Sequence, residues 1–82
     1  MNCKILGWKE DLYNDTNQLY ISAVTEYEAK IAEINLQYLS KNIPPIDIQS
    51  EENIIIFGIS RKIKINKSIM ERKILELLLK LN

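Results

Sequence analysis

Few side chains in this sequence could do chemistry, and their spacing limits what that chemistry could be. The chain holds no histidine and one cysteine, Cys3. Catalysis by histidine, a disulfide within the chain and a cysteine-rich zinc site are therefore excluded. The two glycines, Gly7 and Gly58, are isolated, so the sequence has no glycine-rich loop that could cradle phosphate. General acid–base work would fall to a carboxylate or lysine whose pKa burial had shifted.

The carboxylates gather in two polar stretches, at Glu10, Asp11 and Asp15 and at Glu51 and Glu52. The first group matches no calcium-loop spacing, and both stretches are typical of solvated loops. We therefore predict a protein without enzymatic activity, cofactor or bound metal. Glu10, Asp11 and Asp15 remain candidates for an acidic docking loop.

Cationic side chains form the strongest candidate binding segment. They are Arg61, Lys62, Lys64, Lys67, Arg72 and Lys73. Lysines that alternate along a strand put their charges on one face, where phosphates could lie across them. The segment offers no surface aromatic ring for base stacking, and the chain has a net charge of zero, which disfavours a dedicated nucleic-acid module. A solvated face or a protein contact is the preferred interpretation, and nucleic-acid binding is the alternative.

The zero net charge conceals two oppositely charged parts of the chain. Residues 1–58 hold four basic and nine acidic side chains, whereas residues 59–82 hold seven basic and two acidic ones. Such a chain could present one face to an acidic partner and another to a basic partner.

Tyrosines supply the other candidate surface. Tyr13, Tyr20 and Tyr27 are seven residues apart and Ile34 continues the series, so all four would share one edge of a helix. That edge could be the rim of the core, the seam of a homodimer or a ridge that binds a partner, because tyrosine is frequent in interface hot spots.

These candidate residues depend on where the helices and strands lie. Residues 3–8 are typical of a short strand, on which Leu6 and Trp8 would share one face. Apolar residues then recur at intervals of four and three, at Tyr20, Val24, Tyr27, Ile31, Ile34 and Tyr38. We predict one helix over 16–41 from this stripe. The alternative is a strand over 18–24 followed by a shorter helix that begins at a Thr25–Glu28 capping box.

The second half of the chain favours strands and a terminal helix. Asn42 and the Pro44–Pro45 pair should end the first helix. Alternation predicts a short strand from Ile46, a turn over 50–53 and a strand covered on both sides over 54–57. We expect this strand to bend at Gly58 and to continue to Ile65, with a hairpin near 60–62 as the alternative.

A capping box formed by Ser68 and Glu71 then begins a helix that runs to the C-terminus. Its apolar face is wide enough to be sandwiched between the sheet and the first helix, or shared with another chain. Residues 1–82 are thus predicted to form one α+β domain of order β-α-β-β-α. Its small antiparallel or mixed sheet would carry both helices on one face.

Neither a long apolar stretch nor a secretory signal is evident, so we expect a cytoplasmic protein that does not enter a membrane. Fifteen isoleucines and eight asparagines suggest an AT-rich genome. In this general character the chain resembles the heterogeneous small inhibitors of phages and mobile elements, including anti-CRISPR proteins. The resemblance implies a non-enzymatic protein that occludes a surface of a host protein, and we expect it to form a homodimer. A small nucleic-acid-binding regulator and a structural or assembly subunit are the alternatives.

Overall fold

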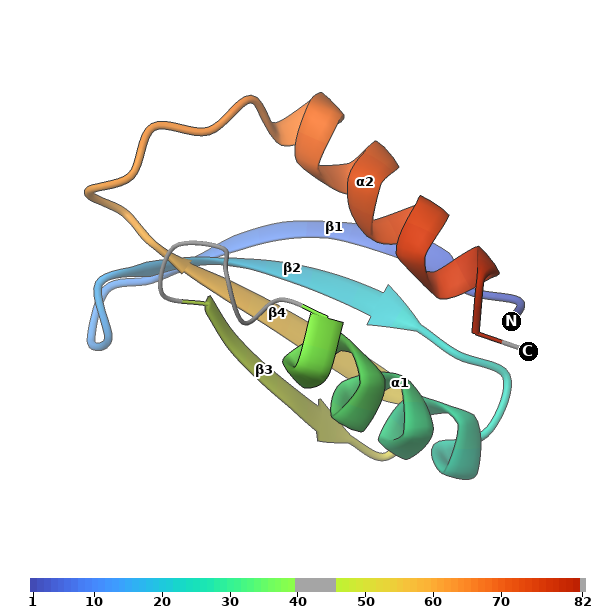
Figure 1. The fold of residues 1–82 in the computed structure, drawn as a ribbon. Helices are drawn as coiled ribbons and strands as arrows, with labels where there is room; N and C mark the ends of the chain where they lie inside the picture. The colour runs from blue at the N-terminus through green and yellow to red at the C-terminus, as the bar shows by residue number, and fades with distance from the viewer. Residues whose placement is uncertain (40–45, 82) are drawn as a thin grey trace.

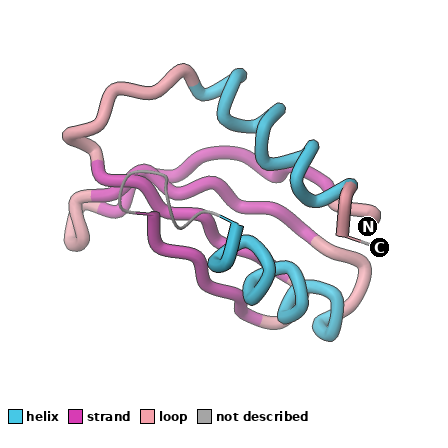
Figure 2. The backbone as a smooth tube through the Cα atoms, viewed as in Figure 1, coloured by secondary structure: helices cyan, strands magenta, loops and turns pink. Residues whose placement is uncertain are grey.

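Two β-hairpins and two helices build the protein, in a computed structural model that describes residues 1–39 and 46–81 (Figure 1). The elements are β1 (Lys4–Asp11), β2 (Thr16–Ser22), α1 (Glu26–Leu39), β3 (Ile46–Glu51), β4 (Ile54–Ser60) and α2 (Lys67–Leu79). The strands form one antiparallel sheet of order β1-β2-β4-β3. The tube view shows both helices beside the sheet and a long loop between β4 and α2 (Figure 2). The predicted α+β class is confirmed, with one strand more than the predicted order.

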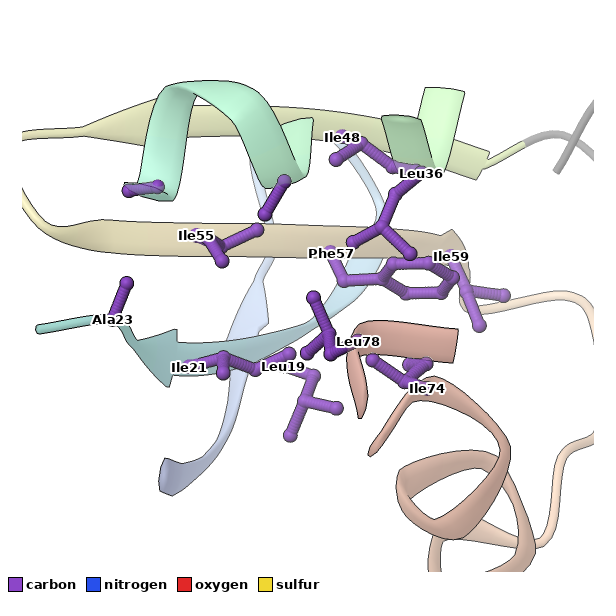
Figure 3. Packing of buried hydrophobic residues seen from close by; sticks show 12 residues of the cluster. Leu19, Ile21, Ala23, Leu36, Ile48, Ile55, Phe57, Ile59, Ile74 and Leu78 are labelled. Atoms are coloured by element: carbon purple, nitrogen blue, oxygen red, sulfur yellow. The ribbon is translucent and has the colours of Figure 1, made fainter. Parts of the chain in front are cut away.

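The core lies between the two helices and one face of the sheet. Alternate residues of the central strands point into it, including Leu19 on β2 and Phe57 on β4, which lie opposite each other in the ladder. Leu36 of α1 and Ile74 and Leu78 of α2 join the same cluster (Figure 3). Because successive side chains of a strand point to opposite faces, one buried face leaves the other available to solvent or to a partner.

The predicted helix over 16–41 is wrong in its first part, where the chain forms β2. Residues Thr16–Ser22 alternate between the buried side chains of Leu19 and Ile21 and the partly exposed side chains between them. The weaker alternative was correct. Thr25 Oγ1 accepts a hydrogen bond of 3.1 Å from the Glu28 N–H and so caps the start of α1. The apolar spacing of three and four residues extends back into β2 because Tyr20 and Val24 are four residues apart. That interval fits the period of a helix as well as the two-residue period of a strand.

Three further expectations need correction. The strand after Gly58 ends at Ser60 and does not bend on to Ile65, and residues 61 and 62 form a turn. Helix α2 is capped by Asn66, whose Oδ1 accepts a 3.1 Å hydrogen bond from the Ile69 N–H, and not by Ser68. Strand β4 is covered by helices on one face, because Ile54 and Ile56 remain partly exposed.

Strand β1 also differs in detail. A register irregularity between Ile5 and Gly7 shifts the alternation, so that Trp8, and not Leu6, lies against the core. The strand beginning at Ile46 is confirmed, but it extends to Glu51, so the turn predicted over 50–53 is limited to residues 52 and 53. The predicted stop at Asn42 and Pro44–Pro45 lies outside the described residues.

Helix α1 also covers the outer edge of β3. Glu33 Oε1 accepts a 2.8 Å hydrogen bond from the Ser50 N–H, and Gln37 Nε2 donates to the Ile48 carbonyl at 2.9 Å. Glu33 also forms an ion pair of 2.8 Å with Lys30. Glu33 and Gln37, one helical turn apart, thus satisfy backbone groups of β3 with which another strand could otherwise pair.

We predict that Leu19→Ala lowers the free energy of unfolding by about 2–5 kcal/mol, because it leaves a cavity at the centre of the core. That is a large part of the stability expected for so small a domain. Denaturant unfolding followed by the fluorescence of Trp8, the single tryptophan, measures the loss. The control Leu12→Ala, at an exposed turn position, should change the free energy by less than about 0.5 kcal/mol.

A second prediction concerns the contact of Glu33 with the sheet edge. Glu33→Ala should lower the free energy of unfolding by about 1–3 kcal/mol, because the Ser50 N–H loses its acceptor. Glu33→Gln keeps an acceptor oxygen and should cost less. Denaturant unfolding at neutral pH compares the two variants.

The pH dependence separates charge from hydrogen bonding at Glu33. The hydrogen bond and charge of Lys30, helped by the Ser50 N–H, hold the pKa of the Glu33 carboxyl below its ordinary value, although burial opposes them. The contribution of the ionised Glu33 carboxylate to the free energy of unfolding is therefore complete above the ordinary carboxyl pKa. It is lost as the pH falls through the lowered pKa. The stability difference between wild type and Glu33→Gln should vanish in acid. A difference that does not change with pH would contradict this account.

Candidate protein-binding surfaces

The acidic loop and the basic segment meet in the folded protein. Arg61 follows β4, and its guanidinium lies 3.5 Å from Asp15 Oδ1 and 4.0 Å from Glu10 Oε2. Its backbone N–H also donates to the Asp15 carbonyl at 2.9 Å. Antiparallel pairing of β2 with β4 brings these distant residues together. The acidic loop and the basic segment, predicted as separate surfaces of opposite charge, therefore partly neutralise each other's charge.

Asp11, the third acidic candidate, organises the turn between β1 and β2. Its carboxylate accepts hydrogen bonds from the Asn14 side chain at 2.7 Å and from the backbone N–H groups of Tyr13 and Asn14. The bonds from Asn14 and Tyr13 lower the pKa of the Asp11 carboxyl. Asp11 therefore has a structural role in the hairpin.

The other cationic side chains of the basic segment do not lie in one continuous row. Lys62 and Lys64 are exposed in the loop after β4, and Arg72 and Lys73 are exposed on α2. The Lys67 ammonium lies 5.6 Å from the centroid of the Trp8 ring, in a cation–π arrangement. Because β4 ends at Ser60, the strand that would have aligned these charges is missing from residues 61–66.

The three tyrosines lie on three different elements. Tyr13 is in the turn between β1 and β2, Tyr20 is on the face of β2 turned away from the helices, and Tyr27 is on α1. The predicted common edge of these residues is therefore wrong, because Thr16–Ser22 is a strand. Of the predicted stripe, only the part from Tyr27 onward is helical.

That helical part forms an exposed apolar ridge, whereas the sequence pattern left open the rim of the core, a homodimer seam and a partner-binding ridge. We call Tyr27, Ile31, Ile34 and Tyr38 the α1 ridge. Tyr27 is 74% exposed, Ile34 57% and Tyr38 68%. The opposite side of the helix contacts the sheet through Ala29, Ala32 and Leu36, all fully buried. Large apolar side chains at coiled-coil spacing thus point away from the protein's own core.

A groove of about 510 Å³ adjoins the α1 ridge. Ile31 and Glu28 line it from α1, Met1 from the N-terminus, and Lys80 and Leu81 from the end of α2. Figure 1 shows the two termini side by side at this end of the molecule. Ile31 belongs to both features, so ridge and groove form one continuous surface.

No family model, curated protein or solved structure matches this chain. Within residues 1–39 and 46–81, no three Asp, Glu, Cys or His side chains gather closely enough to hold a metal ion. None of the described helices is both long and apolar enough to cross a membrane.

Cys3 packs against the core from the N-terminal side of β1. Burial raises the pKa of its thiol, the positive N-terminus opposes this effect, and the Glu28 carboxylate adds to it. We predict that an aromatic disulfide reagent at pH 8 modifies Cys3 about tenfold more slowly in the folded protein than in urea, because less thiolate is present and access is limited. Equal rates in the two states would show a reactive, accessible thiol.

Proposed function

We propose that this protein is a non-enzymatic protein-binding domain whose α1 ridge docks an amphipathic helix of a partner protein. The observation that carries the proposal is the exposure of Tyr27, Ile34 and Tyr38, with the partly buried Ile31 between them on the same side of α1. Their spacing of four, three and four residues is that of a coiled-coil seam, to which a facing helix is complementary. Helix α1 is anchored to the sheet by its other side, so its contact with the sheet does not require the exposed apolar side chains of the ridge.

The dimensions of the α1 ridge suit a short helix. From Tyr27 to Tyr38 the ridge is about 17 Å long at ~1.5 Å per residue, which matches three turns of a partner helix. Two exposed tyrosines supply broad apolar rings with a polar end. Charged and amide side chains of Lys30, Glu28 and Asn35 border the ridge and would fix the register of the partner.

The composition supports a narrower form of this proposal. In that form the partner belongs to a host cell, in the manner of phage or anti-defence inhibitors, and binding blocks a surface that the partner needs. Binding to nucleic acid through the cations after β4 is the competing hypothesis, and the following experiment separates the two.

We predict that Ile34→Asp weakens partner binding by about 10- to 100-fold, because it places a charge in the middle of the apolar ridge. The matched control is Leu12→Asp, which changes an exposed leucine far from α1 and should bind as wild type does. Both variants should unfold near the wild-type midpoint, because both side chains are exposed.

The measurement combines affinity capture with photo-crosslinking from position 34. Crosslinks confined to one face of an amphipathic helix in the captured protein would support the proposal. Capture that Ile34→Asp does not affect would contradict it. So would capture that nuclease abolishes and that weakens by several log units per tenfold rise in salt, as expected for nucleic acid.

A further inference from the structure

The sheet face turned away from the helices carries its own ordered pattern of charge. We call it the open sheet face, and no described helix or loop lies across it (Figure 1). The ladder aligns its side chains in rows across the strands. One row is Lys4, Ser22, Ile54 and Glu51, the next is Gly7, Tyr20, Ile56 and Gln49, and the third is Lys9, Gln18, Gly58 and Asp47.

Both outer rows run from a lysine on β1 to a carboxylate on β3. The middle row places Tyr20 and Ile56 at the centre, and Leu6, which is 53% exposed, stands beside Gly7 at the irregularity in β1. The Lys9 ammonium lies 6.0 Å from the centroid of the Tyr20 ring, so it leans over this centre. Across these three rows the open sheet face thus has lysines at the β1 edge, an apolar middle and carboxylates at the β3 edge. Asp11 lies beyond Lys9 on the same face of β1, where its carboxylate accepts hydrogen bonds from the turn residues Tyr13 and Asn14.

We infer that the open sheet face binds a second copy of this chain, related by a two-fold axis parallel to the strands. Such an axis places β1 of each copy over β3 of the other. Lys4 then faces Glu51 of the other copy, Lys9 faces Asp47, and Tyr20 lies over Ile56. Gly58, which the side chains of Gln18 and Asp47 of its own copy already cover, lies opposite Gln18 of the other copy. The result is two sheets packed face to face with the helices on the outside.

The charges favour this dimer over the face-to-face dimer whose two-fold axis runs across the strands. An axis across the strands would bring β1 over β1 and β3 over β3, with Lys4 near Lys9 and Glu51 near Asp47. Like charges would then meet at both edges, which is unfavourable. Association through the β3 edge is opposed by Glu33 and Gln37, which already occupy its backbone groups. The irregularity in β1 opposes pairing at the other edge.

The size of the open sheet face implies a modest affinity. Four strands ~4.8 Å apart give a face about 19 Å wide, so two copies would bury less than the ~1,600 Å² of a standard interface. We therefore expect a weak dimer, with a dissociation constant of about 100 μM that salt increases. Sedimentation equilibrium between about 10 μM and 1 mM should show the mass rising from 9.6 kDa towards twice that value.

Charge exchange provides the decisive test. Lys4→Glu should weaken the dimer about tenfold or more, because the new carboxylate would face Glu51 at two symmetry-related places. The double variant Lys4→Glu/Glu51→Lys should restore the dissociation constant to within about threefold of wild type. Within one copy these residues are three strand spacings apart, roughly 14 Å, so restoration reports a contact between copies.

Two controls make the outcome specific. Lys62→Glu reverses a charge away from the open sheet face and should leave the dimer unchanged. Ile34→Asp should also leave it unchanged, so failure of this dimer is distinguishable from failure of partner binding at the α1 ridge. A mass of 9.6 kDa at 1 mM would overturn the inference. Tighter association of Lys4→Glu, or loss of the dimer in Ile34→Asp alone, would overturn it as well.

Discussion

The whole structure depends on one apolar layer, formed where the helices close over a single face of the sheet. Leu19, Ile21, Ile55, Phe57 and Ile59 supply the sheet side of that layer, and both helices contribute to the other side. A domain of this size has no second core. The two-residue period of β2 and β4 therefore decides which side chains stabilise the fold and which are left for binding. The open sheet face and the α1 ridge are two described surfaces that lie outside this layer.

Much of the fold could be predicted from local patterns, and the main error shows where such patterns end. The alternation after Ile46 and the apolar stripe around Ile74 identified β3 and α2 correctly. For Thr16–Ser22, an apparent heptad and a strand pattern coincide at Tyr20. The choice is made by pairing with β1 and β4, a non-local contact that no short window contains. The Thr25 cap was the local signal that could have ended the ambiguity.

The surfaces were harder to predict than the fold, for a related reason. Summing charge along the chain separated an acidic part from a basic one, but the register of the sheet places Arg61 against Asp15 and Glu10. The same register creates the lysine-to-carboxylate rows of the open sheet face, which no sequence interval reveals. The α1 ridge was visible as a stripe. Its outward orientation could have been inferred from Ala29 and Ala32, whose small side chains let the helix approach the sheet closely.

The two proposed surfaces are compatible because they point in opposite directions. A dimer joined through the open sheet face keeps both α1 helices on its outer layers, so each ridge remains accessible. Two ridges on one particle would bind a dimeric or repetitive partner with an effective concentration that a monomer lacks. A weak self-association would then make partner binding depend on the amount of protein present, since bivalence is gained only as the dimer forms. Weak pairing through the sheet would in this way set the concentration at which the α1 ridge becomes an effective binding surface.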